Sequence, residues 1–281
     1  MKECIKVGLL GAGTVGSGVL TVLEENTAEI EKKVGVPIHV SKILVRDMKK
    51  AKELSEKYQL TDKIEDIVED PEIDIVVELI GREHPAKEYI AAALEHKKNV
   101  VTANKDVLAK YGKELFPLAE ENKVDFMFEA SVGGGIPIIR PLCTSLAQEH
   151  IESITGILNG TTNYILSKME NEGADFETVL KRAQEKGYAE RNPEADVCGY
   201  DAGRKIAILT SLAYGKNVDF ADLYVEGITQ ITRMDFAYAK KLGTTIKLFA
   251  KSQCIDGKYY AMVAPFMVTA DNPLYAVQNV F

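Results

Sequence analysis

Asp201 and Lys205 stand four positions apart in a segment whose apolar spacing is typical of a helix. At that spacing both side chains project from one face of the helix, about one turn apart. One interpretation is an ion pair on an exposed helix surface. The segment continues through the apolar residues 206–209, however, so much of it is expected to be buried. Charges at the start of a buried helix need partners or a chemical role, which makes the pair a candidate functional site.

A glycine-rich segment near the N-terminus matches the pattern G-x-G-x-x-G between an apolar strand-like stretch and an amphipathic one. In a nucleotide-binding fold the first glycine permits a tight turn, the second lets the backbone approach a diphosphate, and the third allows close packing of helix and strand. The helix N-terminus adds free N–H groups. The alternative is a turn with a structural role only. The predicted cofactor-binding residues here are Gly11, Ala12, Gly13, Thr14, Val15 and Gly16.

The second predicted strand ends with Val45, Arg46 and Asp47, at the position where such folds distinguish NAD from NADP. An acidic residue there would hold the ribose 2′-hydroxyl of NAD, whereas Arg46 can pair with the 2′-phosphate of NADP. Asp47 lies one position later. The pattern favours NADP, with NAD as the alternative, and a solvated loop cation is the other interpretation of Arg46.

The first half of the chain alternates between strand-like and helix-like stretches, which predicts a doubly wound parallel sheet of the Rossmann type. After Glu129 this alternation stops, and we place a domain boundary there, giving domains 1–130 and 131–281. The first domain is predicted to have strands at 4–10, 38–45, 73–79, 99–102 and 124–128, and helices at 17–33, 49–58, 85–95 and 110–122.

The second half is predicted to be an α+β domain with a largely antiparallel sheet. Asp256-Gly257 between two apolar alternating stretches is typical of a hairpin with a type I′ turn. The predicted strands are 151–158, 245–254 and 259–268, and the predicted helices are 161–170, 176–186 and 201–214.

The composition is that of a folded globular protein, with 46% hydrophobic and 27% charged residues in 281. A net charge of −8 disfavours nucleic acid or an anionic membrane as the main partner. No apolar run reaches the length of a membrane span, no secretory signal pattern precedes the first strand, and the cysteines are widely spaced. We therefore expect reduced thiols and a cytoplasmic location.

Four collinear motifs follow the glycine fingerprint and cover nearly the whole chain. They are Thr-Ala-Asn-Lys at 102–105, Glu-Ala-Ser-Val-Gly-Gly-Gly-Ile-Pro at 129–137, Gly-Ile-Leu-Asn-Gly-Thr-Thr-Asn-Tyr at 156–164, and Gly-Tyr-Ala-Glu at 187–190 with Asp-Ala-Gly-Arg-Lys at 201–205. Together these motifs resemble those of homoserine dehydrogenases. That family interconverts L-aspartate 4-semialdehyde and L-homoserine with NAD(P)(H), in threonine, methionine and isoleucine biosynthesis, and the resemblance also implies a homodimer.

The resemblance implies that Lys205 is the general acid and, in the reverse direction, the general base. Hydride addition to an aldehyde leaves an alkoxide, and a protonated lysine is a suitable proton donor for it. The resemblance places Lys105 on the cofactor and substrate side of the cleft, where its charge would polarise the carbonyl and lower the pKa of Lys205. From its position alone, Lys105 can also be an ordinary loop lysine.

Homoserine carries an ammonium group, so its site needs carboxylates. The resemblance assigns this role to Glu190 and Asp201, with Asp196 as a further candidate. It also implies that Gly187 lets the backbone approach the cofactor and that Tyr188 lines the pocket. For Tyr188 and Asp196, packing or solvation is an equal alternative.

The glycine-rich segment 129–137 suits a backbone folded closely around a small group, or a tight hinge between domains. The resemblance implies a sodium ion bound by backbone oxygens at this segment. The implied ligands are Glu129, Val132, Gly134 and Ile136.

Three features depart from the family pattern. Asn192 replaces the acidic residue commonly seen before the proline that follows the Gly187 motif. Arg82 follows Gly81 where the family usually has paired glycines, and it can re-aim a loop near the cofactor. The chain also ends at Phe281, where related chains continue with a strand, a glycine-rich segment and, in some, a regulatory ACT-type domain. Either the sequence is a fragment or the natural chain is short. We expect the 281-residue chain to bind NADP weakly with little homoserine oxidation.

Two alternatives remain at the level of the sequence. One is a catalytically silent protein or fragment that binds a nucleotide. The other is a different two-domain amino-acid dehydrogenase, such as one acting on aspartate, which has no reason to retain Glu190, Asp201 and Lys205 at these spacings.

Overall fold

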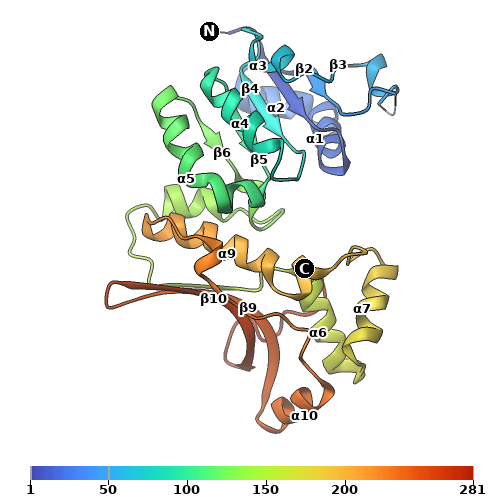
Figure 1. Cartoon of the computed structure of the whole chain (residues 1–281), viewed down its shortest axis with the longest axis vertical. Helices are drawn as coiled ribbons and strands as arrows, with labels where there is room; N and C mark the ends of the chain where they lie inside the picture. Colours follow the sequence, from blue (N-terminus) through green and yellow to red (C-terminus); the bar gives the residue numbers. More distant parts are fainter. Residues whose placement is uncertain (1, 50, 281) are drawn as a thin grey trace. The chain divides into compact units, whose positions relative to one another are not determined.

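The computed structural model describes residues 2–49 and 51–280, and its internal contacts divide the chain into two units (Figure 1). Unit 1 is Met1–Pro137 and unit 2 is Ile138–Phe281. Each unit has its own sheet and its own helices. Among the described residues, no helix combines the length and the apolar character needed to cross a membrane.

Unit 1 contains a six-stranded parallel sheet with the strand order β3-β2-β1-β4-β5-β6. Strands β2 and β3 are added on one side of β1, and β4 to β6 are added on the other side. Folds of this kind bind ligands at the carboxyl ends of the strands where the order of addition switches, here β1 and β4. The strands are β1 (Ile5–Leu10), β2 (Ile38–Leu44), β3 (Gln59–Thr61), β4 (Ile75–Glu78), β5 (Asn99–Thr102) and β6 (Phe126–Met127). The helices are α1 (Thr14–Glu25), α2 (Thr27–Val34), α3 (Glu65–Val68), α4 (Ala86–Glu95) and α5 (Lys105–Asn122), with the 3₁₀ turns η1 (Leu54–Glu56) and η2 (Glu129–Ser131).

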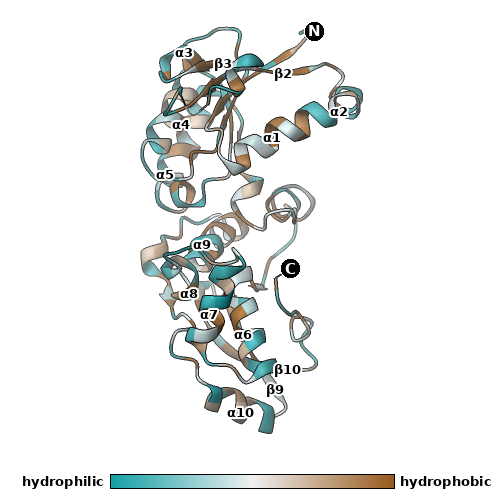
Figure 2. Ribbon diagram, turned by 90° about the vertical axis from the view of Figure 1, so that its right-hand side faces the viewer, coloured by the Kyte–Doolittle hydropathy of each residue, from teal (hydrophilic) through white to brown (hydrophobic). Residues whose placement is uncertain are grey.

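Both faces of this sheet are buried. Successive side chains of a strand point to opposite faces, so Leu9 joins one hydrophobic cluster with Leu20 of α1, whereas Leu10 joins another with Ile90 of α4. Burial on both faces explains why the central strands β1 and β4 are mainly apolar. In Figure 2, α1 has both hydrophobic and hydrophilic segments, as expected for a helix that covers one face of the sheet. The predicted doubly wound parallel sheet is confirmed.

Two predicted helices of unit 1 are wrong in detail. The helix expected at 17–33 is interrupted at Asn26, whose φ of −109° and ψ of 18° leave the helical region and whose side-chain amide donates to Val22 O. The helix expected at 49–58 is instead a series of turns ending in η1, although Lys50 lies outside the described residues. Leu54 and Tyr58 pack against the cluster that contains Leu20, so tertiary contacts override the local helical pattern.

Unit 2 contains a four-stranded sheet with the order β7-β9-β10-β8, and α6 and α9 pack against it. β9 pairs antiparallel with β7 and β10, whereas the short β8 is parallel to β10, so the largely antiparallel sheet is confirmed. The strands are β7 (Ser153–Gly156), β8 (Tyr224–Val225), β9 (Thr244–Ile255) and β10 (Lys258–Thr269). The helices are α6 (Gly160–Glu172), α7 (Phe176–Glu185), α8 (Glu194–Val197), α9 (Tyr200–Tyr214) and α10 (Arg233–Lys241), with the π-helical turn η3 (Pro141–Ser145) and the 3₁₀ turn η4 (Phe220–Asp222).

The β9–β10 hairpin turns at Asp256-Gly257, where φ is 50° and 73°. Positive φ at both central residues is what a type I′ turn requires, so this prediction is confirmed. The sequence did not predict α10, which begins with a capping box formed by Thr232 and Asp235. It also did not predict β8, which is only two residues long.

A buried lysine joins β9 to the last described residues of the chain. Lys247 has no exposed surface, and its Nζ donates to Val277 O at 2.5 Å. Burial lowers the pKa of Lys247, because removal from water penalises the charged form. Val277 also packs against Phe249 and Val268, so residues around 277 form part of the hydrophobic core of unit 2.

Candidate functional site

The turn after β1 has a backbone that only glycine fits. Gly11 has a φ of 97°, in the left-handed region, and a Cβ atom at Gly16 would lie 2.2 Å from Gly11 O. Gly16 therefore lets α1 pack against the turn itself. A Cβ atom at Gly13, the N-cap of α1, would meet nothing within 4 Å, so the backbone there is open to a ligand. The remaining predicted residues, Ala12, Thr14 and Val15, complete the turn and the first helical residues, whose N–H groups precede the first α1 hydrogen bond.

This turn opens into a cleft of about 1250 Å³ that lies wholly within unit 1, here called the glycine cleft. Gly11 and Gly13 line it together with Arg46 and Asp47, which follow β2, and with Arg82, which follows β4. Each of these positions is at the carboxyl edge of the sheet, and the cleft therefore coincides with the ligand-binding edge of this fold.

An ion pair between α1 and the segment before β3 lines part of the glycine cleft. Lys57 Nζ lies 3.1 Å from a Glu24 carboxylate oxygen, and the Tyr58 hydroxyl donates to the same carboxylate at 2.6 Å. Partial burial and this hydrogen bond raise the pKa of Tyr58 to about 12. The hydrogen bonds from Tyr58 and Lys57 lower the pKa of Glu24. The charge of Lys57 is therefore already compensated.

A chain of buried polar groups joins the ends of β4 and β5. The Glu78 carboxylate, which has no exposed surface, accepts hydrogen bonds from Ile80 N at 2.7 Å and from the Thr102 hydroxyl at 2.6 Å. The Thr102 hydroxyl accepts from Asn104 N, and the Asn104 amide donates to Arg82 O at 2.9 Å.

Asn104 also caps α5, since its side-chain oxygen accepts from Val107 N. Lys105 is the first residue of that helix and is half-buried. The buried chain thus fixes the backbone that carries Lys105, at the carboxyl edge of the sheet where its motif predicted it.

The segment that contains the predicted cation ligands forms a tight turn after η2. Gly133 and Gly135 have φ of 68° and 79°, and Ile136 N donates to Gly133 O at 2.7 Å. The carbonyl oxygens of Val132, Gly134 and Ile136 accept no hydrogen bond from another described residue. Glu129 lies in η2 at the start of the segment. Within residues 2–49 and 51–280, no group of His, Cys, Asp or Glu side chains is arranged to hold a metal.

In unit 2, Asp201 and Lys205 form the ion pair that their spacing predicts. Lys205 Nζ lies 2.7 Å from Asp201 Oδ2 and also donates to Leu158 O at 2.8 Å. The side chains are largely buried, with exposed fractions of 7% for Asp201 and 19% for Lys205. Asp201 lies in the first turn of α9, where the helix dipole favours a negative charge. The surface ion pair considered for these residues is excluded by this burial.

Asn159 connects this pair to a third predicted residue, and its importance was not recognised from the sequence. Its amide nitrogen donates to Asp201 Oδ2 at 2.9 Å and to Asp196 Oδ1 at 2.7 Å, while its side-chain oxygen accepts from Thr162 N and caps α6. An asparagine directly before a helix is a signal for a cap, but the spacing does not indicate the two carboxylates. Asn159, Asp196, Asp201 and Lys205 are called the Asn159 cluster below.

The loop after α7 carries the other predicted residues of unit 2. Gly187 has a φ of 74° and open space beside its Cα atom. Tyr188 is 44% exposed, its ring packs edge-on against Tyr164, and its carbonyl accepts from the Thr161 hydroxyl at the start of α6. The carboxylate of Glu190 is exposed and makes no hydrogen bond or ion pair with another described residue. It is not part of the Asn159 cluster.

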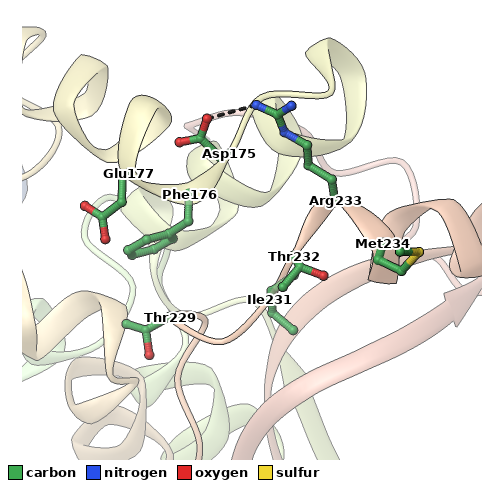
Figure 3. A pocket seen from close by; sticks show the side chains of 8 residues that line it. All are labelled: Asp175, Phe176, Glu177, Thr229, Ile231, Thr232, Arg233 and Met234. Carbon is green, nitrogen blue, oxygen red and sulfur yellow. Dashed lines mark hydrogen bonds and ion pairs between the residues drawn. The ribbon is translucent and has the colours of Figure 1, made fainter.

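A smaller pocket of about 480 Å³ lies near the start of α7, and Figure 3 shows its lining. Asp175 and Arg233 form an ion pair at 2.9 Å across its rim. Both side chains of this pair are at least half exposed, and none of the predicted site residues lines the pocket. It therefore lacks the buried charged groups that distinguish the Asn159 cluster.

Comparison with known sequences matches each half of the chain to one family. The model of the homoserine dehydrogenase family matches residues 137–281, and the model of the homoserine dehydrogenase NAD-binding domain matches residues 11–129. The chain belongs to the homoserine dehydrogenase family. The resemblance found in the sequence motifs is thereby confirmed.

Relatives within this family share both sequence and fold with the chain. The homoserine dehydrogenase of Bacillus subtilis is 46% identical over 99% of this chain. The crystal structure of a homoserine dehydrogenase from Thiobacillus denitrificans has a TM-score of 0.95 and 45% identity, and covers 99% of this chain. A hyperthermophilic archaeal homoserine dehydrogenase in complex with NADPH has a TM-score of 0.81 and 28% identity over 98% of this chain, which spans 85% of that protein.

The chain spans 65% of the length of the Bacillus subtilis protein and 64% of the Thiobacillus denitrificans chain.

Proposed function

We propose that this protein is a homoserine dehydrogenase, which transfers hydride reversibly between NADP(H) and L-aspartate 4-semialdehyde or L-homoserine. The observation that carries the proposal is the buried Asp201–Lys205 pair held by Asn159, in a member of this family whose other unit contains the glycine cleft. The product belongs to threonine, methionine and isoleucine biosynthesis.

The glycine cleft is the proposed cofactor site. Its open turn at Gly13 and the N–H groups at the start of α1 suit a diphosphate, and Arg46 suits the 2′-phosphate of NADP. NAD is the alternative cofactor. A related archaeal enzyme has been solved with NADPH, which supports a phosphorylated nicotinamide cofactor. When bound, the nicotinamide supplies or accepts the hydride.

Lys205 is proposed to transfer the proton. A protonated lysine has three N–H donors, and Asp201 and Leu158 O accept two of them, so one remains for the substrate oxygen. In reduction this donor protonates the oxygen of the former aldehyde, and in oxidation the neutral amine removes the hydroxyl proton. Asp201 holds the amine in place, and Lys105 is proposed to act on the cofactor and substrate side.

The remaining predicted residues are proposed to bind the amino-acid part of the substrate. The unpaired carboxylate of Glu190 suits the α-ammonium group, and Asp196 provides a second carboxylate beside Asp201. The open backbone at Gly187 and the exposed ring of Tyr188 suit the cofactor and the pocket wall.

A sodium ion is proposed at the turn formed by residues 129–136. Hard monovalent cations prefer oxygen ligands, and the carbonyl oxygens of Val132, Gly134 and Ile136 have no other partner among the described residues. Glu129 is the proposed fourth ligand. We also propose that unit 1 binds the cofactor, that unit 2 binds the substrate, and that the active protein is a homodimer.

Oxidation of L-homoserine with NADP, followed by the near-ultraviolet absorbance of the reduced cofactor, tests the proposal. Because the chain spans 65% of the Bacillus subtilis relative, the assay is run on the chain alone and on the chain fused to the remaining part of that protein. We expect both forms to bind NADP and the fused form to oxidise homoserine.

Three other outcomes are informative. Cofactor binding with no oxidation in either form indicates a catalytically silent nucleotide-binding protein. Oxidation of aspartate in place of homoserine indicates an aspartate dehydrogenase. Turnover on the order of 10 s⁻¹ by the 281-residue chain alone contradicts the expectation that this chain oxidises homoserine poorly.

A further inference from the structure

Both arginines of unit 1, Arg46 and Arg82, line the glycine cleft. Neither guanidinium forms a hydrogen bond or an ion pair with another residue in the described ranges 2–49 and 51–280. Lys57, which lines the same cleft, is by contrast paired with Glu24. Two unpaired guanidinium groups in one cleft favour a ligand that carries more than one anionic group.

The two arginines approach the glycine turn from opposite sides. β2 and β4 are the two neighbours of β1 in the sheet, so Arg46 follows the strand on one side and Arg82 follows the strand on the other. The turn lies directly against the β4 side, because a Cβ atom at Gly11 would be 3.0 Å from Leu79 O. In folds of this type, the 2′-phosphate of NADP binds near the end of β2, whereas the diphosphate binds over the glycine turn.

We propose that Arg82 is a further cofactor-binding residue, whose guanidinium binds the diphosphate shared by NAD and NADP. This inference rests on the proposed cofactor role of the glycine cleft and adds a ligand to it. A planar guanidinium can donate two parallel hydrogen bonds to phosphate oxygens, and no other group in the described residues competes for it.

The backbone at Arg82 is held in place before any ligand binds. The amide of Asn104, which is 4% exposed, donates to Arg82 O, and Glu78 holds the chain two residues after β4 through Ile80 N. Gly81 has a φ of 78°, which turns the chain between these two anchors. A fixed backbone leaves only side-chain rotamers to be ordered when the phosphate binds, which lowers the entropic cost of the contact.

Calorimetric titration of the whole chain with NADP, NAD and 2′-AMP tests the inference without requiring turnover. We expect Arg82→Ala to weaken NADP and NAD by the same factor, about tenfold, because both contain the diphosphate. Its affinity for 2′-AMP, which lacks a diphosphate, is expected to be unchanged. Arg82→Lys keeps the charge without the planar fork and is expected to lie between the wild type and Arg82→Ala.

Two control variants separate this role from general electrostatics. Arg46→Ala is expected to weaken NADP and 2′-AMP more than NAD. Lys87→Ala removes a cation of α4 that does not line the cleft and is expected to leave all three affinities unchanged.

The inference is overturned if Arg82→Ala changes both dinucleotide affinities by less than about twofold, or if it weakens only NADP and 2′-AMP. In those cases the wild type still binds both cofactors and the proposed function stands. Failure of the wild type to bind either dinucleotide instead contradicts the proposed function, and the inference with it.

Discussion

The glycine cleft of unit 1 and the Asn159 cluster of unit 2 are built in opposite ways. The cleft consists of open backbone at Gly13 and of Arg46 and Arg82, which have no partners among the described residues. In the Asn159 cluster, the carboxylate of Asp201 is buried and bonded to both Asn159 and Lys205. A ligand can therefore bind to the Gly13 backbone and to these two arginines without breaking internal hydrogen bonds. The cluster is assembled in advance, so a substitution there is expected to change stability as well as chemistry.

The largest expected effect is the loss of turnover when Lys205 is replaced. Lys205→Ala is expected to reduce turnover by about 10² or more in the form of the protein that oxidises homoserine, because the proposed general acid is lost. Affinity for NADP should change little, since the glycine cleft lies within unit 1. Lys181→Ala, on the exposed surface of α7, is the matched control. An equal loss of NADP affinity would place Lys205 in the nucleotide site and remove the contrast between the two regions.

The next effect is on the stability of unit 2. Asn159→Ala removes the cap of α6 and the amide that serves Asp196 and Asp201, so we expect a loss of about 2–4 kcal/mol in the free energy of unfolding. Asp175→Ala removes the exposed cap of α7 and is expected to cost less than Asn159→Ala. Urea denaturation measures both. Equal losses in the two variants would show that the Asn159 cluster contributes only an ordinary helix cap.

Two glycines of α1 test how the cleft depends on its backbone. Gly16→Ala places a methyl group where a Cβ atom would be 2.2 Å from Gly11 O, so the turn must shift, at a cost of about 1–3 kcal/mol and with weaker dinucleotide binding. A Cβ atom at Gly18 meets nothing within 4 Å, so Gly18→Ala should stabilise the helix by about 0.5–1 kcal/mol. Thermal unfolding and cofactor titration of both variants check this. Similar behaviour of the two would show that the turn is more adaptable than its geometry indicates.

The smallest effect concerns Tyr58, which lines the glycine cleft. Its pKa of about 12 in the folded protein exceeds the ordinary value of 10.0, so the hydroxyl contributes stability that is fully present below pH 10 and is lost as the pH rises towards 12. Tyr58→Phe should remove this part of the alkaline destabilisation. Ultraviolet titration of phenolate is compared between the wild type and Tyr58→Phe. The component that the variant lacks should ionise near pH 12. A missing component near pH 10 would mean that Glu24 and partial burial do not hold the proton.

The sequence by itself determined the features that depend on short windows. The glycine spacing at 11–16 specifies a turn because positive φ and close packing are properties of single residues. The four-residue spacing of Asp201 and Lys205 specifies an ion pair because one helical turn brings them together. The hairpin at Asp256-Gly257 follows from the same kind of local rule.

Tertiary structure decided the features that join distant segments. The hydrogen bonds from Asn159 to Asp201 and from Lys205 to Leu158 O span 42 and 47 residues, and no periodicity within a short window encodes them. The predicted helix at 49–58 was wrong for the same reason, since packing of Leu54 and Tyr58 against α1 outweighed a local preference of a few tenths of a kcal/mol per residue. Local geometry is set by neighbours along the chain, whereas the burial that fixes these contacts exists only after the whole unit has folded.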